Sequence, residues 1–340
     1  MIVPRIVKRE LKEITALVHG TWNGGGPVRA DPFDHFFDFQ FLNQSLSQSC
    51  PQMKVYRSID DLWDVPSIQI PNHISLNSIH ARLINTTVVY NTSALSQQIE
   101  TYVNEMSPPK ERTRPVRFHL DVTNWAFPMI SSHPELRRHY GRILRIREDL
   151  RRLSAVATFN LAKRYQLDLD PRQGLREDSF VGVHLRTEED AQYTFPRFNE
   201  QASNLIDYIA GSGRQVVFVA TGATKNDDVT LLAGMAEKFN VTVVRKQDLL
   251  EGQDLQLLED LTWDERALVD YEIMLRAGLM AGPAGSTFSW GVASRRARVA
   301  GTVGGGLVTN ATGYVQWRDS RSALFGVNSK SLVLRDTVWP

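Results

Sequence analysis

Short apolar runs rich in β-branched residues alternate with helical patterns through the second half of the chain. The apolar runs predict strands at 180–185, 215–220, 241–245, 279–282 and 298–303. The spacing of apolar positions between them predicts helices near 197–211, 226–239, 264–277 and 286–296. This alternation predicts a parallel sheet with helices on both faces, in a doubly wound α/β domain.

The first half of the chain is less regular. Candidate strands lie at 2–7, 54–57, 87–90 and 116–120. Glycine and proline predict loops at 20–32 and 105–115. We interpret residues 1–130 as a smaller α/β domain.

A long helix is predicted at about 134–166, because apolar residues from Leu136 to Leu161 recur at near-helical spacing. This segment carries seven arginines between Arg137 and Arg152. The arginines form either a site for an anionic partner or a solvated helix face with acidic neighbours. The second interpretation is favoured, because charge runs on helices usually face solvent.

Composition and charge exclude several classes of function. The formal net charge of +1 gives no strong field that would recruit nucleic acid, so no nucleic-acid partner is predicted. No apolar run reaches the roughly 18 residues that a membrane span needs. The single cysteine, Cys50, cannot form an internal disulfide. The eight histidines show no paired ligand spacing and no zinc motif occurs, so no metal site is predicted.

The first strand of the α/β domain ends in a burst of charged residues, "HLRTEED". Side chains alternate between the faces of a strand, so His184 and Arg186 share a face with Gly182, which would leave open space beside them. An arginine at a strand end can bind a phosphate through two parallel hydrogen bonds. The alternative is that Arg186 pairs with Glu188 or Asp190.

A second candidate site is the segment "GPAGSTFSW", where a predicted strand ends at Gly282 and a helix opens at Ser286 and Thr287. The first turn of a helix has unpaired N–H groups and the positive end of the helix dipole. With two hydroxyl groups added, this segment is typical of a phosphate-binding turn. The alternative is simple capping of the helix by Ser286.

Asp270 is a third candidate, because it lies within an apolar stretch of a predicted helix and so is expected to be partly buried. A buried carboxylate needs hydrogen-bond donors. The N1–H and N2 amine of a guanine would supply two donors. The alternative, an aspartate on the helix surface or at its cap, is favoured when this residue is considered by itself.

Taken together, "FVGVHLRTEED", "FVATG" and "LVDYEIMLRAGLMAGPAGSTFSW" resemble, in content and order, the GDP-fucose protein O-fucosyltransferase family. The "HLR-x-E-x-D" segment is similar to the version found in plant and fungal members. "VTVVRKQDLL" occupies the place of a "TKEDLL"-type stretch of that family. The resemblance is strong over 175–300 and looser over 1–130.

The resemblance implies a GT-B-like fold, with two Rossmann-like domains facing a cleft. It implies an acceptor-side domain at 1–130, a long connecting helix at 131–170 and a nucleotide-sugar-binding domain at 171–340. The implied reaction is an inverting, metal-independent transfer of fucose from GDP-fucose to a hydroxyl group of a protein or glycan. GDP-fucose is the donor substrate, and no cofactor is implied.

The resemblance also implies roles for individual residues. Arg186 would contact the diphosphate and stabilise the leaving charge, with His184 beside it, and Asp270 would read the guanine. The remaining donor-binding residues are implied around the phosphates: Ser286, Thr287, Phe288, Gly285 and Asp190.

One departure from the family concerns the start of the chain. Members begin with a strand, a glycine-rich loop and a helix before the strand that "IVPRIV" resembles, so the first strand–helix unit is expected to be missing here. The family suggests the lumen of the ER or Golgi, although no signal or anchor is visible. Two alternatives stay open: a non-catalytic domain that binds a GDP-sugar or a partner, and a glycosyltransferase that uses another nucleotide sugar.

Overall fold

The computed structural model describes most of the second half of the chain and shorter parts of the first. The described residues are 6–7, 30–49, 51, 55–57, 67–70, 82–84, 87–89, 92–106, 117–120, 140–170, 172, 175–191, 195–222, 227–299, 306–309 and 315–326. Among them, no helix is both long and apolar enough to cross a membrane.

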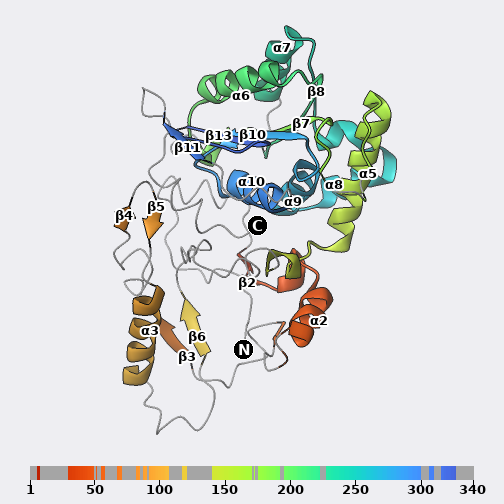
Figure 1. Cartoon of the computed structure of the whole chain (residues 1–340). Helices are drawn as coiled ribbons and strands as arrows, with labels where there is room; N and C mark the ends of the chain where they lie inside the picture. Colours follow the sequence, from red (N-terminus) through yellow and green to blue (C-terminus); the bar gives the residue numbers. More distant parts are fainter. Residues whose placement is uncertain are drawn as a thin grey trace.

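A seven-stranded sheet forms the centre of the second half, with the order β11-β12-β13-β10-β7-β8-β9 (Figure 1). Its strands are β7 (Val181–His184), β8 (Val216–Ala220), β9 (Thr242–Val244), β10 (Leu279–Pro283), β11 (Gly306–Thr309), β12 (Val315–Arg318) and β13 (Ser322–Phe325). The strands from β13 to β9 are parallel, and β11 and β12 extend the β13 edge in antiparallel pairs. The predicted α/β class and parallel sheet are confirmed.

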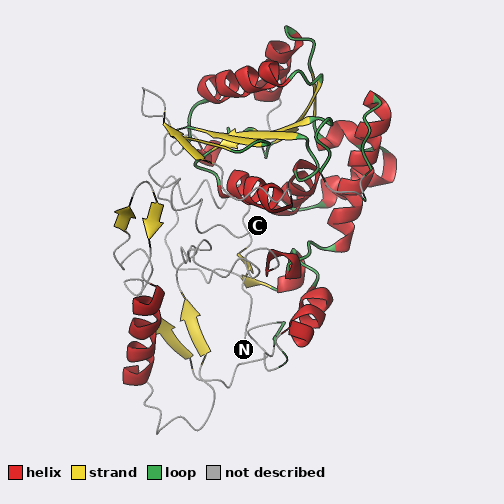
Figure 2. Cartoon of the chain, in the orientation of Figure 1, coloured by secondary structure: helices red, strands yellow, loops and turns green. Residues whose placement is uncertain are grey.

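Helices cover both faces of this sheet (Figure 2). On one face lie α6 (Phe198–Ser212) and α7 (Asp227–Glu237), and on the other lie α9 (Trp263–Met274) and α10 (Thr287–Val299). The four strands and four helices predicted between 180 and 296 are confirmed to within a few residues. One further helix, α8 (Gly252–Asp260), was not predicted.

The alternation of side chains along β7 is as predicted. Val181 and Val183 belong to the core on the α6–α7 face, whereas Gly182 faces α9. The prediction that Gly182 leaves open space is wrong. A Cβ placed there would lie 2.6 Å from Met274 Sδ and 3.1 Å from Ala277 Cβ, so the absence of a side chain lets α9 pack closely against the strand.

The prediction of a strand at 298–303 is also wrong for its first two residues. Arg298 and Val299 belong to the last turn of α10, and residues 300–303 lie outside the described part of the chain. The buried guanidinium of Arg296 donates to the carbonyl oxygens of Met274, Ala277 and Gly278, near the end of α9. These contacts anchor α10 against α9, close to the place where the strand was expected.

The long helix predicted at 134–166 is shorter than expected. The helix α5 runs over Glu148–Tyr165 and follows a 3-10 turn at Tyr140–Ile143, while 134–139 lie outside the described residues. It begins at Glu148 because the backbone just before it pairs with another segment: Asp38 N–H donates to the Arg145 carbonyl and Arg147 N–H donates to the Phe36 carbonyl. The apolar face of α5 packs into the same core as the sheet.

The arginines before and within α5 have acidic neighbours. Arg145 pairs with Asp38, Arg152 pairs with Asp254 at 2.8 Å, and Arg147 binds both Asp149 and Glu265. These ion pairs join α5 to α8, α9 and the segment before α2. They support the interpretation of these arginines as paired structural residues.

The described strands of the first half are short. The strands are β1 (Ile6–Val7), β2 (Ala30–Asp31), β3 (Ser67–Ile70), β4 (Arg82–Ile84), β5 (Thr87–Val89) and β6 (Arg117–Leu120), and the helices are α2 (Phe39–Ser49) and α3 (Thr92–Met106). The strands pair into two-stranded sheets, and the pair formed by β3 and β6 is parallel. The strand predicted at 54–57 is reduced to a single bridge at Val55. The division at 130 and 170 stays a prediction.

Candidate functional site

The order of the parallel strands defines a switch point between β7 and β10. From β7 the chain passes through α6 to β8 and through α7 to β9, on one face of the sheet. It then returns across the other face to β10, which lies on the opposite side of β7, and continues through α10 to β13. In open α/β sheets, ligands bind beyond the carboxyl ends of the strands at such a point.

Both phosphate-binding candidates follow the two strands of the switch point. His184 is the last residue of β7 and Arg186 lies two residues later, while Gly285 and Ser286 lie between β10 and α10. The structure therefore brings together, at one edge of the sheet, two segments about 100 residues apart in sequence.

His184 contacts the first turns of α10. Its Nδ1 lies 2.8 Å from Ser289 Oγ, and its ring centroid lies 4.7 Å from that of Phe288. A Cβ at Gly282 would lie 2.6 Å from Ser289 Oγ and 3.1 Å from His184 Cβ, so a glycine is needed here for the close approach. Burial, and then the nearby Arg186 cation, lowers the pKa of His184 to about 3. His184 is therefore a neutral hydrogen-bonding group.

The start of α10 has the features expected of an anion-binding turn. Ser286 is buried just before the first helical residue, and its carbonyl accepts the N–H of Trp290 at 3.1 Å. The Ser286 hydroxyl accepts only a long hydrogen bond of 3.4 Å from Ser289 N–H, so its capping role is weak. Thr287 is exposed, and Gly285 and Phe288 are half-buried. The Ser286 N–H donates to the Pro283 carbonyl at 3.2 Å. The N–H groups of Thr287 and Phe288, the first two helical residues, have no acceptors within the helix.

Arg186 points into a cluster of polar and aromatic groups. Its Nη1 lies 2.6 Å from Glu188 Oε2, and its guanidinium carbon lies 5.6 and 5.7 Å from the ring centroids of Phe195 and Trp263. The second oxygen of Glu188 accepts the N–H of Gly222, just beyond β8, at 2.6 Å. The structure thus shows the pairing with Glu188 that was the alternative to phosphate binding.

Asp270 is buried, which rules out the alternative of a surface or capping residue. Its side chain lies on α9 with 2% of the residue exposed, and its Oδ2 lies 2.5 Å from Lys246 Nζ. Its Oδ1 has no hydrogen-bond partner among the described residues. Burial raises the pKa of Asp270 to about 6, Lys246 opposes this rise, and the carboxylate of Glu188 adds to it.

Lys246 is the main residue of this region that sequence reasoning missed. It is the first residue of a 3-10 turn (Lys246–Leu249) directly after β9, and it is buried. The available signal was a lysine directly after the strand predicted at 241–245, in the segment "KQDLL". Its partner is 24 residues away, on another element.

Contacts connect the three predicted motifs. Glu188 pairs with Arg186, and its negative charge contributes to the raised pKa of Asp270. Tyr271, next to Asp270, lies 5.9 Å from Phe288 between ring centroids, and Phe288 contacts His184. The backbone of Asp190 belongs to a short 3-10 turn (Glu189–Ala191), and its side chain lies outside the described part.

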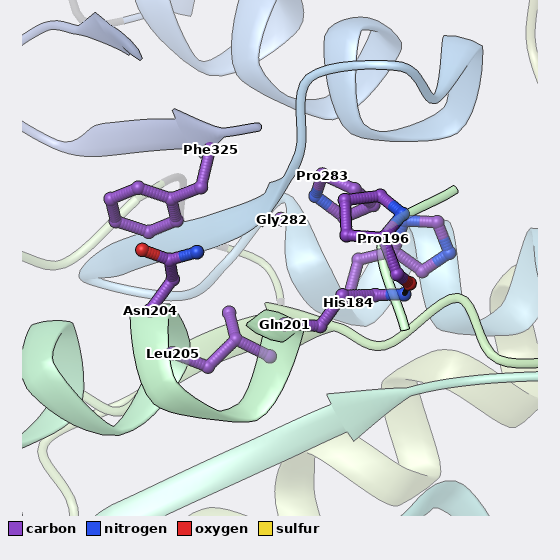
Figure 3. A pocket seen from close by; sticks show the side chains of 8 residues that line it. All are labelled: His184, Pro196, Gln201, Asn204, Leu205, Gly282, Pro283 and Phe325. Atoms are coloured by element: carbon purple, nitrogen blue, oxygen red, sulfur yellow. Dashed lines mark hydrogen bonds between the residues drawn. The ribbon is translucent and has the colours of Figure 1, made fainter. Parts of the chain in front are cut away.

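A small pocket with an empty volume of about 230 Å³ lies on the α6 side of the same sheet edge (Figure 3). His184 and Gly282 line it from the strands, and Gln201, Asn204 and Phe325 line it from α6 and β13. The volume of about 230 Å³ includes space that is open to solvent, and the cavity itself measures about 10 Å³. Pockets that bind small molecules usually enclose about 300–1,000 Å³. This pocket is too small for a nucleotide sugar, and Arg186, Asp270 and Ser286 do not line it.

Within the described ranges, no group of three or more His, Cys, Asp or Glu residues is arranged to hold a metal ion.

A scan against protein-family models and a search of curated proteins each found no match. A search of solved structures found similarity to a crystal structure of POFUT1 in complex with GDP-fucose, with 13% sequence identity and a TM-score of 0.45. The similarity covers 96% of this chain and 89% of that chain. A similarity at this level does not indicate a function.

Proposed function

We propose that this protein is a glycosyltransferase that transfers fucose from GDP-fucose, with inversion and without a metal, to a hydroxyl group of a protein or glycan. The observation that carries the proposal is that Arg186 and the start of α10 follow the carboxyl ends of β7 and β10, which are neighbouring strands at the switch point. The proposed architecture is GT-B-like, with the described α/β domain as its donor-binding half.

The diphosphate of the donor would bind between two positive groups. The guanidinium of Arg186 offers parallel hydrogen bonds to phosphate oxygens, and the first turn of α10 offers the N–H groups of Thr287 and Phe288, next to the Ser286 hydroxyl. A phosphate would compete with Glu188 for Arg186, and its larger negative charge favours the exchange. Both groups stabilise the charge that develops on the leaving diphosphate as the bond to fucose breaks.

His184 would support this arrangement as a neutral group. Its pKa of about 3 means that it adds no positive charge at neutral pH. Its hydrogen bond with Ser289 and its contact with Phe288 hold the start of α10 against the end of β7. We assign it the role of fixing the distance between the two phosphate-binding segments.

Asp270 would bind the guanine base. Its Oδ1 is a buried acceptor with no partner among the described residues, while Lys246 holds Oδ2 and favours the ionised carboxylate. A guanine N–H can fill this vacant acceptor position. Because Asp270 is almost fully buried, side chains around it must move for the base to enter.

Two measurements test the proposal. Calorimetry measures binding of GDP and GDP-fucose, and a GDP-release assay with protein and glycan acceptors measures transfer. Replacing Arg186 with Ala should lower kcat by roughly 10²–10³, because one group that stabilises the leaving charge is lost. Replacing Arg172 with Ala is the matched control, because Arg172 is an exposed arginine that pairs only with Asp170 among the described contacts.

Normal turnover by Arg186→Ala would refute the assignment. Binding of GDP-fucose without any GDP release would favour a non-catalytic GDP-sugar-binding domain. Release from a different nucleotide sugar, with none from GDP-fucose, would favour another glycosyltransferase specificity.

A further inference from the structure

Gln201 contacts both ends of the loop that carries the candidate donor-binding charges. This buried residue lies in the first turn of α6. The loop between β7 and α6 runs from Arg186 to Pro196, and Arg197 then precedes the first residue of the helix. Its side-chain amide makes hydrogen bonds to Arg186 and to Pro196, which are the first and last residues of that loop.

The bonds to Arg186 are paired. Gln201 Oε1 accepts the backbone N–H of Arg186 at 3.0 Å, and Gln201 Nε2 donates to the backbone carbonyl of Arg186 at 2.7 Å. The same Nε2 donates to the carbonyl of Pro196 at 2.7 Å. The amide therefore satisfies both backbone groups of Arg186 just beyond the last residue of β7, as a neighbouring strand would.

The segment held in this way contains the partners of the Arg186 side chain. Glu188, which pairs with the guanidinium, and Phe195, which packs beside it, both lie between Arg186 and Pro196. By bonding to both ends of the loop, Gln201 fixes the backbone that carries the Arg186 guanidinium, together with Glu188 and Phe195 on either side of it.

We propose that Gln201 is a positioning residue that fixes Arg186 for contact with the donor diphosphate. This inference rests on the proposed function, because it assigns to Gln201 an effect that passes through Arg186. It predicts that loss of the amide weakens GDP binding even though Gln201 itself does not touch the ligand.

The test is a double-mutant cycle measured by calorimetry with GDP. Gln201→Met should bind GDP about tenfold more weakly than wild type, a change of about 1.4 kcal/mol. In the Arg186→Ala background the same substitution should change GDP affinity less than about twofold, because the group through which it acts has been removed. Gln201→Glu keeps the size of the side chain but loses both donated bonds, so it should behave like Gln201→Met.

Asn204→Ala provides the matched control. Asn204 lies one turn further along α6 and lines the same small pocket. Among the described contacts its side chain donates only within its own helix, to the Glu200 carbonyl. Its GDP affinity should equal that of wild type, and thermal melts should show all variants folded. The inference about Gln201 would be overturned if both Gln201 variants bound GDP as tightly as wild type. It would also be overturned if the substitution weakened GDP binding equally with and without the Arg186 side chain. Neither result would affect the proposed function. Failure of wild type to bind GDP would overturn the proposed function as well.

Discussion

Replacing His184 with Asn should change how the stability of the protein depends on acid. In the fold, burial and the Arg186 cation lower the pKa of His184 to about 3, whereas an unfolded chain gives histidine a pKa of about 6.5. The folded state thus excludes a proton that the unfolded state accepts. The contribution of His184 is fully present above pH 6.5 and is lost as the pH falls toward 3.

The size of the effect follows from these two pKa values. Below pH 6.5 each unit of pH removes about 1.4 kcal/mol from the free energy of unfolding, so lowering the pH from 7 to 5 removes about 2 kcal/mol. Asp270 acts in the opposite direction, because its pKa rises from 3.8 to about 6 and the folded state then binds the extra proton. The informative quantity is therefore the difference between wild type and variant, in which the Asp270 contribution cancels.

Urea denaturation at pH 7, 6 and 5 measures this difference. His184→Asn removes the titrating ring, so the stability advantage of wild type over the variant should shrink by about 2 kcal/mol between pH 7 and 5. Ser289→Ala is the control, because it removes the partner of His184 but keeps the imidazole buried, and its deficit should be nearly constant with pH. A constant gap between wild type and His184→Asn would refute the reasoning about a buried, neutral histidine.

Two further predictions concern buried cations. Replacing Arg296 with Met should lower the free energy of unfolding by about 3–5 kcal/mol in urea denaturation. The reason is that the buried carbonyls of Met274, Ala277 and Gly278 lose their donor. A loss below about 1 kcal/mol would contradict this, because it would show that water replaces the guanidinium. Replacing Lys246 with Met should cost about 3–5 kcal/mol at pH 7.5 by leaving the Asp270 carboxylate buried without its cation. That cost should fall at pH 5, where Asp270 takes up a proton, and a pH-independent cost would contradict this account of the pair.

Local patterns predicted the part of the fold that depends on short-range periodicity. The strands β7 to β10 and the helices α6, α7 and α9 follow from alternating apolar runs and helical spacing, which depend directly on the faces that pack together. The two candidate phosphate-binding segments could be located in the same way, because each follows a predicted strand. Their adjacency in space depended on the order of β7 and β10 in the sheet, which no local pattern specifies.

Long-range contacts account for the predictions that were wrong. The helix predicted from 134 begins at Glu148, because Arg145 and Arg147 form backbone hydrogen bonds with Asp38 and Phe36, more than 100 residues earlier. The strand predicted at 298–303 begins inside α10, next to the anchoring contacts of Arg296. In each case a partner distant in sequence determines the local conformation.

The candidate site shows the same limit. Considered by itself, Asp270 was expected at the helix surface or its cap, and its burial and its pairing with Lys246, which lies on a different element, are seen only in the structure. The space expected beside Gly182 is filled by Met274, because the glycine serves the packing of α9. Which charges pair inside a protein is determined by tertiary packing, so the ion pairs of the site could be recognised only from the structure.

A crystal structure of the protein with GDP tests the central claim most directly. We predict that the diphosphate lies beyond the carboxyl ends of β7 and β10, with its oxygens bound by the guanidinium of Arg186 and by the N–H groups of Thr287 and Phe288. The guanine should donate to Asp270. GDP bound at another edge of the sheet, or a diphosphate that makes no contact with Arg186, would contradict the claim.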